Sequence, residues 1–258
     1  MAIDLRGRTI VITGASSGIG AATARACAAA GMQCVVAARR EQELAALADE
    51  LGSACRAIPG DVTQPGFNET LLACEPYAVL ANAGRGLEQA MIDCDMAQFR
   101  ALFEVNLFAA VELASLAAKQ MAAGWEGHIL LCASCLSKFA IPQHTAYCAS
   151  KAAVERVARA MQMELRSTGV HVTSVHPIGT RTEFFDTSAA LSGHDQSDFI
   201  ERTPKMFMQP PNRVADAVVR CLRRPRGEVW TSHSMRLAST LFSAFPRLAQ
   251  ALVARFRP

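Results

Sequence analysis

Short runs of apolar and β-branched residues recur along the chain, and longer stretches with apolar residues at helical spacing separate them. Such short runs are typical of buried β-strands, and the longer stretches are typical of helices with one buried face. The predicted strands lie at residues 8–13, 33–38, 54–59, 78–82, 128–133, 170–175 and 227–231. The predicted helices lie at residues 18–30, 41–51, 66–74, 96–123, 146–167 and 212–223.

This alternation of strands and helices predicts the fold class. Consecutive strand–helix–strand units form right-handed crossovers, which place parallel strands in one sheet and helices on both of its faces. We therefore predict an α/β chain, a single doubly wound domain over residues 1–258 with a seven-stranded parallel sheet. Residues 181–211 interrupt the pattern with an irregular segment, and residues 233–258 are predicted to form an apolar helical extension.

The composition indicates which kinds of binding partner and which cellular compartment to expect. Apolar residues make up 51% of the 258 residues, and the net charge of +3 is too small to indicate a nucleic-acid partner. Nine cysteines without a recognisable leader at the N-terminus indicate free thiols in a reducing compartment, so we expect a cytoplasmic protein. The sequence has no uncharged apolar run of about eighteen residues, so no membrane-spanning segment is expected.

The sequence TGASSGIG at residues 13–20 follows the first predicted strand and opens the first predicted helix. Gly14, Gly18 and Gly20 permit positive φ angles and a close approach of the backbone to a ligand. A helix N-terminus at this point offers N–H groups and the positive end of a dipole to a pyrophosphate. The alternative interpretation is an ordinary tight turn between a strand and a helix.

The sequence AYCASK at residues 146–151 places Tyr147 and Lys151 one helical turn apart on one face. A neighbouring ammonium group favours the phenolate and lowers the pKa of a tyrosine. Lowering that pKa from about 10 to near neutrality takes about 4 kcal/mol, which one lysine seldom supplies. A second positive charge is therefore expected near the phenol.

Together these motifs resemble those of the short-chain dehydrogenase/reductase family over nearly the whole chain. The resemblance also rests on NAG at residues 82–84, on Asn106 in FEVNLF, and on Ser134, which precedes Tyr147 by thirteen residues. It implies a Rossmann-like fold and an oxidoreductase that interconverts a carbonyl and a secondary alcohol with a nicotinamide cofactor. A carbonyl compound or an alcohol is accordingly the expected small-molecule partner.

The same resemblance implies a catalytic role for four residues. Tyr147 would be the general acid and base, and Ser134 would hold the substrate oxygen. Lys151 would bind the nicotinamide ribose and, together with the oxidised nicotinamide, lower the pKa of Tyr147. Asn106 would carry a water that links Lys151 to solvent. Each residue also has a purely structural interpretation, a packing tyrosine or a strand-end hydroxyl for example, and their common register argues against it.

The end of the second strand bears on cofactor choice. Ala38 occupies the position where an acidic residue binds the ribose 2′-hydroxyl, and Arg39 and Arg40 follow, which favours NADP(H) over NAD(H). Alternatively, Arg40 is a solvated residue at the start of a helix. The residues expected to contact the cofactor are Gly14, Ser16, Ser17, Gly18, Ile19, Gly20, Arg39, Arg40, Asp61, Val62, Asn82, Ala83, Gly84, Tyr147, Lys151, Pro177 and Thr182.

Two segments depart from the family pattern. In HPIGTRTEFF, Ile178 replaces the usual glycine after Pro177, so a shifted local path is expected. The C-terminal extension lacks the usual Asp-Gly-Gly loop, which favours a homodimer over a tetramer. This extension is apolar with scattered arginines, and it is expected either to pack over the substrate cleft or against a partner subunit, or to rest on a membrane surface.

Residues 181–211 correspond to the segment that covers the substrate in this family. Its apolar members indicate a lipophilic ketone or alcohol, although simple packing explains them equally well: Phe184, Phe185, Leu191, Phe199, Met206, Phe207 and Met208. Cys132 and Cys135 have no second pair spaced for zinc, so no metal site is expected. His144 and Lys138 are expected on the surface, and the alternative for both is a place lining the cleft. A catalytically silent sensor or a membrane-associated scaffold remains the alternative to an enzyme.

Overall fold

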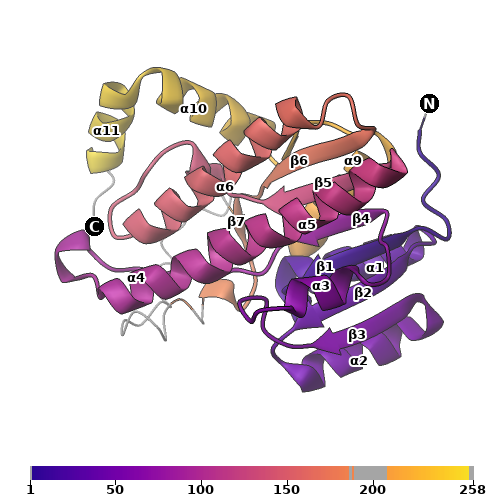
Figure 1. Cartoon of the computed structure of the whole chain (residues 1–258). Helices are drawn as coiled ribbons and strands as arrows, with labels where there is room; N and C mark the ends of the chain where they lie inside the picture. The colour runs from indigo at the N-terminus through magenta and orange to yellow at the C-terminus, as the bar shows by residue number, and fades with distance from the viewer. Residues whose placement is uncertain (1, 186–187, 189–207, 256–258) are drawn as a thin grey trace.

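A seven-stranded parallel sheet forms the centre of the computed structural model, which describes residues 2–185, 188 and 208–255 (Figure 1). The strand order is β3-β2-β1-β4-β5-β6-β9. The strands are β1 (Thr9–Thr13), β2 (Gln33–Ala38), β3 (Cys55–Pro59), β4 (Ala78–Ala81), β5 (Gly127–Cys132), β6 (Val170–His176) and β9 (Glu228–Trp230). The order changes direction between β1 and β4, and this is the place where open α/β sheets bind ligands. The predicted fold class is therefore confirmed.

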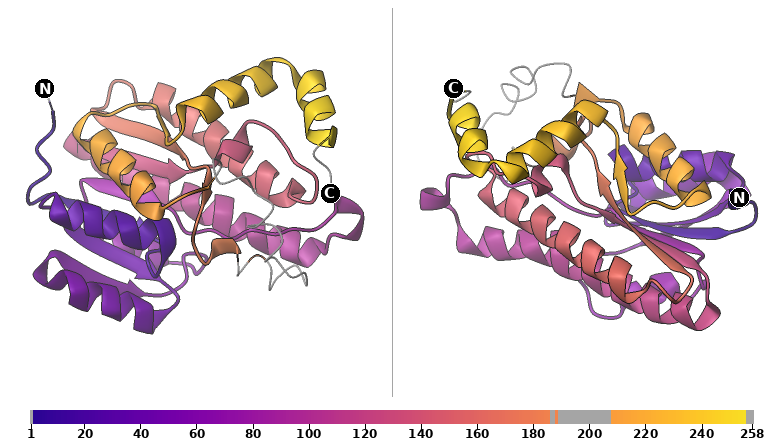
Figure 2. Two further views of the ribbon diagram at one scale, coloured as in Figure 1. Left: turned by 180° about the vertical axis from the view of Figure 1, so that it is seen from behind. Right: turned by 90° about the horizontal axis from the view of Figure 1, so that it is seen from above.

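Helices cover both faces of the sheet (Figure 2). One face carries α1 (Gly18–Ala29), α2 (Glu41–Leu51) and α9 (Pro211–Arg223). The other face carries α3 (Phe67–Leu72), α5 (Ala109–Gly124) and α6 (Thr145–Glu164). Each face has its own apolar cluster, so the strands are buried on both sides. This burial explains why the strands read as unbroken apolar runs rather than alternating patterns.

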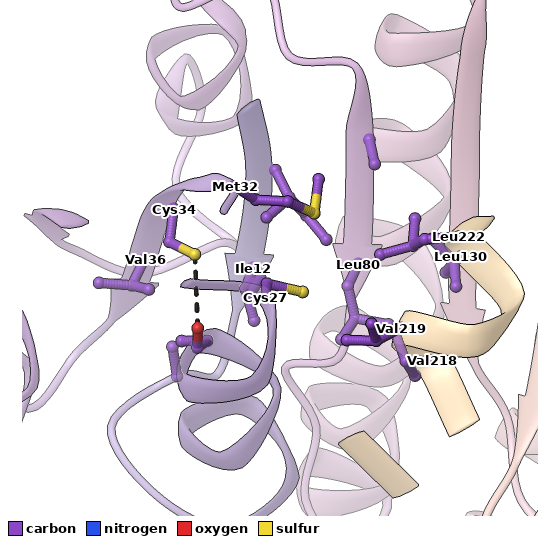
Figure 3. Packing of buried hydrophobic residues seen from close by; sticks show 14 of the residues in the cluster. Ile12, Cys27, Met32, Cys34, Val36, Leu80, Leu130, Val218, Val219 and Leu222 are labelled. Atoms are coloured by element: carbon purple, nitrogen blue, oxygen red, sulfur yellow. Dashed lines mark hydrogen bonds between the residues drawn. The ribbon is translucent and has the colours of Figure 1, made fainter. Parts of the chain in front are cut away.

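Side chains along β1 show how the two clusters arise. Ile12 lies beside Cys27 of α1, in one apolar cluster with Leu80 and Leu130, as Figure 3 shows. Its neighbour Val11 points to the opposite face and packs beneath α5. Both side chains of this pair are fully buried. Successive strand residues therefore anchor different helix layers, which fixes the register of β1 in the sheet.

The stretch predicted as one helix over residues 96–123 consists of three parts. These are α4 (Met96–Phe103), a π-helical turn at Glu104–Phe108, and α5. The whole of Met96–Gly124 has the length and apolar composition of a membrane-spanning helix, the only such stretch within the described ranges. Its residues Leu113 and Ala117 pack in one cluster with Val79 and Ile129 of the sheet, and this packing accounts for the apolar composition.

The C-terminal extension is helical, as the sequence predicts. It comprises α10 (His233–Ala244) and α11 (Pro246–Arg255), and the ring of Phe242 on α10 packs against that of Phe139. Pro246 is the first residue of α11. Proline is tolerated in the first turn of a helix but not in its interior, so a helix can begin at this residue but cannot run through it. Most of the predicted irregular segment 181–211 lies outside the described residues. At its two ends, β7 (Gly179–Thr180) pairs with β8 (Met208–Gln209).

Candidate active site

The glycine loop after β1 interlocks with the NAG segment after β4. Gly14 has a φ angle of +66°, and a Cβ atom there would lie 2.8 Å from the Cα atom of Ala83. Asn82 closes the contact from the other side, because its side-chain amide donates to the carbonyl oxygen of Thr13 at 3.0 Å. The structure therefore brings these two predicted segments together at the point where the strand order changes direction.

The N-terminus of α1 is open to an anion. Ser17, the N-cap residue, makes no side-chain capping bond, and the first turn contains no acidic residue. A Cβ atom on Gly18 would lie 2.7 Å from Cγ2 of Thr182, and one on Gly20 would overlap the carbonyl oxygen of Gly14. The backbone therefore packs closely at both glycines, and the helix dipole adds a positive potential at this uncapped helix N-terminus.

Ser134 and Tyr147 come together from different elements. Ser134 follows β5 and is the N-cap of a short 3-10 turn, η4 (Cys135–Ser137), and its Oγ atom accepts from the N–H of Leu136 at 3.1 Å. Tyr147 lies in the first turn of α6, and its side chain faces that of Ser134. Burial raises the pKa of Tyr147 well above its ordinary range and outweighs the lowering effect of the Ser134 hydroxyl.

Lys151 is buried beneath this pair. Its side chain is 4% exposed, and Nζ donates to the carbonyl oxygen of Cys132 at 2.7 Å. Nζ lies 5.9 Å from the centroid of the Tyr147 ring. Burial lowers the pKa of Lys151. In the chain by itself, burial is the largest cause of the pKa shift of Tyr147, and it acts against the effect expected of a neighbouring ammonium.

Asn106 lies in the π-helical turn between α4 and α5. Its Oδ1 atom accepts from the N–H of Arg85 at 2.8 Å, and its Nδ2 atom donates to the carbonyl oxygen of Arg85 and to Oγ of Ser150. Ser150 in turn donates to the carbonyl oxygen of Tyr147 at 2.8 Å. Single π-helical turns occur frequently at functional sites, and this one directs the buried amide toward α6.

The two arginines after β2 differ in their surroundings. The guanidinium of Arg40 contacts Oγ of Ser16 and forms a 2.6 Å ion pair with Glu183. Arg39 is 73% exposed, and within the described residues its ion-pair partner is Asp61, with a carboxylate oxygen 4.0 Å away. The adjacent Val62 is buried at 7% exposure. Arg39 is therefore the more open cation at this edge of the sheet.

The loop after β6 accommodates its unusual isoleucine. Pro177 is buried and accepts a hydrogen bond from the N–H of Cys135 at 3.0 Å. Ile178 is buried at 6% exposure, and Thr182 lies against the glycine loop. The segment therefore lies beside Ser134 at one end and beside α1 at the other.

The prediction of a surface position for Lys138 is wrong. Its side chain is 14% exposed and forms an ion pair with Glu155, whose side chain is 1% exposed. Glu155 follows Lys151 by four residues and therefore lies on the same face of α6. This spacing was the signal that the sequence offered, but two of the partners of Glu155, Lys138 and Ser137, come from another segment.

All nine cysteines are free. Burial raises the pKa of the Cys135 thiol to about 11, and it also raises the pKa of Cys132. Such thiols are protonated at neutral pH and react slowly. Across the part of the chain that the structure describes, no three His, Cys, Asp or Glu side chains are grouped closely enough to hold a metal ion.

The comparison with known families identifies the chain. The short chain dehydrogenase family matches residues 8–191, which include the glycine loop, Asn106, Ser134, Tyr147 and Lys151. The chain belongs to this family. It is thus an oxidoreductase of the kind that acts on carbonyl and alcohol groups.

Individual relatives are similar over most of their lengths. The chain is 29% identical to a dehydrogenase/reductase SDR family protein 7-like of Drosophila melanogaster, over 89% of this chain and 74% of the relative. A short chain dehydrogenase/reductase from Burkholderia phymatum, solved in complex with NAD, has a TM-score of 0.85 at 24% identity and covers 96% of both chains. A short-chain dehydrogenase from Sphingobium yanoikuyae, solved with NADPH, has a TM-score of 0.79 at 25% identity and covers 97% of this chain and 96% of its own.

Proposed function

We propose that the protein is an NADP(H)-dependent oxidoreductase that interconverts a hydrophobic ketone and a secondary alcohol, with Tyr147 as general acid and base. The observation that carries this proposal is that the side chains of Ser134 and Tyr147 face each other beside the buried ammonium of Lys151. This group lies at the carboxyl end of the sheet, where the glycine loop also lies. A substrate oxygen that accepts from both hydroxyls would be oriented for proton transfer.

The residues at this edge fit a nicotinamide cofactor. The open N-terminus of α1 suits its pyrophosphate, and Gly84 leaves room beside the catalytic groups. A Cβ atom on Gly84 would lie 3.0 Å from Oδ1 of Asn106 and 3.5 Å from Nζ of Lys151. We propose that the loops carrying the predicted contact residues from Gly14 to Thr182 hold the cofactor. When bound, the cofactor supplies or accepts the hydride.

The side chains of the site would carry out the proton transfer to or from the substrate oxygen. The raised pKa keeps the Tyr147 hydroxyl protonated, which is the form that a general acid needs to donate to a carbonyl oxygen. Ser134 would donate a hydrogen bond to the same oxygen and stabilise its developing negative charge. The ammonium of Lys151 would stabilise the phenolate that remains, and Asn106 would hold the water that returns a proton through Lys151.

The preference for NADP(H) rests on the end of β2. Ala38 provides no carboxylate that would repel a 2′-phosphate, and the exposed guanidinium of Arg39 is available to bind one. Arg40 is already paired with Glu183, so its contribution would be smaller. The two solved relatives carry NAD and NADPH respectively, and they therefore give no preference for this chain.

The substrate preference rests on the aromatic side of the site. The ring of Phe184 packs edge-on against that of Tyr147 with 5.5 Å between the centroids, and Phe185 packs against Phe184. These rings lie at the start of residues 181–211, the segment that we propose to cover the substrate. The other apolar residues that support this role, Leu191, Phe199, Met206 and Phe207, lie outside the described residues. Apolar rings beside the phenol favour a lipophilic carbonyl compound.

A screen of NADPH oxidation over apolar ketones, sugars and short keto acids tests this function. We expect turnover of apolar ketones, and a loss of about 10²-fold or more in kcat for Tyr147→Phe. Tyr77→Phe, which changes the chain's other tyrosine, is the matched control and should retain activity. Equal rates for Tyr147→Phe and the parent would reject the proposed acid. NADPH binding without turnover of any carbonyl would favour the silent sensor instead.

We also propose that the chain forms a homodimer in a reducing, cytoplasmic compartment. The free cysteines support the compartment. Met96 and Phe108 along the α4–α5 stretch are 46% and 55% exposed, and such large apolar side chains are typical of subunit contacts. Sedimentation equilibrium tests the assembly, and a monomer at micromolar concentration would contradict it.

Peripheral contact with a membrane through α10 and α11 is a second proposal, and a specific observation favours it. Leu237, Leu241 and Phe245 follow one another at four-residue spacing and are 63%, 48% and 59% exposed. No acidic residue follows Glu228, whereas four arginines do. An exposed apolar stripe next to basic residues suits an anionic lipid surface. The inner face of α10 packs over η4 at the same time, with 5.3 Å between the ring centroids of Phe139 and Phe242.

A further inference from the structure

A cluster of charged side chains lies directly behind Ser134. Glu155 of α6 binds Nζ of Lys138 and Nε of Arg159, the latter at 2.7 Å. Arg159 also pairs with Glu228 of β9, and Arg236 of α10 lies 3.8 Å from the same carboxylate. Glu155 is the most deeply buried of the five, with its side chain 1% exposed. The cluster therefore joins α6, β9, α10 and the end of η4 around one buried carboxylate.

Glu155 reaches the site through Ser137. The Oε2 atom of Glu155 accepts from Oγ of Ser137 at 2.8 Å. Ser137 is the last residue of η4, and Ser134 is the N-cap residue of the same short turn. The N–H of Ser137 donates to the carbonyl oxygen of Ser134 at 3.1 Å. The carboxylate thus fixes one end of a turn whose other end carries the hydroxyl that faces Tyr147.

A second contact fixes the same carbonyl group. Nδ1 of His176 lies 3.1 Å from the carbonyl oxygen of Ser134. Because that oxygen can only accept, Nδ1 must carry the proton, and Nε2 of the neutral ring accepts from Oγ of Ser174 at 2.9 Å. Oγ of Ser137 also lies 2.7 Å from the carbonyl oxygen of Ser134 and 3.2 Å from Nδ1 of His176, but the carboxylate of Glu155 is the strongest acceptor for its single proton. Ser137 and His176 therefore both contact the backbone carbonyl of Ser134, and neither takes up the proton of the Ser134 hydroxyl.

Stability alone does not account for a carboxylate at this position. Burying an ion pair costs desolvation free energy that the attraction between the charges often only balances, and an apolar side chain would fill the same space. Glu155 instead orients the turn that carries Ser137. Its Oε2 atom accepts a hydrogen bond from Ser137, while its Oε1 atom binds the cations of Lys138 and Arg159. Glu155 also shares the face of α6 that carries Tyr147 and Lys151. One face of α6 therefore carries the proposed general acid Tyr147, the ammonium of Lys151 and the carboxylate of Glu155.

We propose that Glu155 is a positioning residue, which holds the Ser134 hydroxyl in register with Tyr147 by anchoring Ser137. The proposal rests on the proposed function of Ser134 and Tyr147 and adds a requirement to it. A loosened turn lets the Ser134 hydroxyl move relative to the phenol, and misplacement of about 1 Å in such a pair costs up to about 10²-fold in rate. Cofactor binding would be spared, because the glycine loop and Arg39 touch none of these groups.

The kinetic test compares Glu155→Gln with Glu228→Gln. Both variants remove one charge from the cluster, but only the first weakens the bond to Ser137. We expect kcat for ketone reduction to fall about tenfold in Glu155→Gln, with the Kd for NADPH within about twofold of the parent. We expect Ser137→Ala to reproduce the fall, while Glu228→Gln keeps its kcat.

In a Ser134→Ala background, Glu155→Gln should cause no further loss, because the serine through which it acts is gone. Additive losses, or equal losses in both glutamine variants, would overturn the proposal.

A second measurement does not depend on turnover. Amide hydrogen exchange over residues 134–139 should be faster in Glu155→Gln and in Ser137→Ala than in the parent, and unchanged in Glu228→Gln. Unchanged exchange in Glu155→Gln would show that the carboxylate does not hold the turn, and it would overturn the proposal whatever the activity. A parent chain that reduces no carbonyl compound would instead contradict the proposed function, and the exchange result would still decide the role of Glu155.

Discussion

Lys151 donates to the carbonyl oxygen of Cys132 at 2.7 Å, so the ammonium is anchored to the end of β5 and not to the phenol of Tyr147. The lysine therefore contributes a fixed positive charge near the tyrosine without hydrogen-bonding its hydroxyl. Burial raises the pKa of Tyr147 in the chain by itself. The arrangement keeps the tyrosine protonated until a further cation arrives beside it.

The titration of Tyr147 can be measured directly, because the chain has only two tyrosines. In Tyr77→Phe, tyrosinate absorbance should appear only above the ordinary pKa of about 10, and NADP⁺ should move its onset to lower pH. The Tyr77 hydroxyl is buried without a hydrogen-bond partner in the described part of the chain, so the Phe variant should fold normally. An onset below pH 10 without cofactor would contradict the effect of burial.

Gly84 should tolerate no side chain without loss of activity. In Gly84→Ala the new Cβ atom would lie 3.0 Å from Oδ1 of Asn106 and would displace that amide. We expect kcat to fall about tenfold while the free energy of unfolding changes by less than about 1 kcal/mol. Gly124→Ala is the control, since its Cβ atom would meet nothing within 4 Å. Full activity of Gly84→Ala, measured as ketone reduction, would show that the space beside Gly84 is not needed for catalysis.

Arg39 and Arg40 should contribute unequally to cofactor choice. Arg39 is exposed, whereas Arg40 is paired with Glu183. We expect Arg39→Ala to lower kcat/KM for NADPH by about 10- to 100-fold and to leave the value for NADH within about threefold. Arg40→Ala should have a smaller effect on the same ratio. If both variants use NADPH as well as the parent does, the preference for the 2′-phosphate does not arise at this edge.

Buried thiols should make the protein less stable in alkali. Burial raises the pKa of Cys34 to about 12, and its Sγ atom lies 3.5 Å from the carbonyl oxygen of Ala24. The unfolded chain loses this proton from about pH 9, while the folded chain keeps it, so the free energy of unfolding falls as pH rises from about 9 toward 12.

Urea unfolding between pH 7 and pH 10 measures this fall for Cys34. The contribution of one such thiol is about 1.4 kcal/mol per pH unit above pH 9, and Cys34→Ala should remove it from the slope. Cys94→Ala, at a half-buried position, serves as the matched substitution against which the slope of Cys34→Ala is compared. Equal slopes in the parent and in Cys34→Ala would contradict the assignment.

The outer stripe of α10 should bind anionic vesicles. We expect the full chain to co-sediment with phosphatidylglycerol vesicles more than with phosphatidylcholine vesicles, and the binding to weaken as salt is added. Leu237→Gln combined with Leu241→Gln should reduce the bound fraction. Met163→Gln changes another exposed apolar residue, one on α6 that is 74% exposed, and should not reduce it. Dissociation of a dimer by the double variant, without vesicle binding by the parent, would assign the stripe to a subunit contact.

The sequence by itself determined the order in which strands, helices and reactive residues follow one another along the chain. The seven strand runs, the glycine loop after the first, and the spacing of Ser134, Tyr147 and Lys151 are all local patterns. Hydrophobic runs and residue spacing set secondary structure and helix faces over a few residues, so these features could be predicted without coordinates. The helical C-terminal extension belongs to the same group, because its apolar residues recur at helical spacing.

Tertiary structure decided the electrostatics of the site. The pairing of Arg40 joins residues 143 positions apart in sequence, and Lys138 is only 14% exposed where Glu155 and Glu228 converge on it from two other elements. The raised pKa of Tyr147 comes from the removal of solvent by several segments together. Burial and ion pairing are sums over neighbours that only folding brings together, so a sequence pattern that names the reacting groups does not fix their charge or their direction.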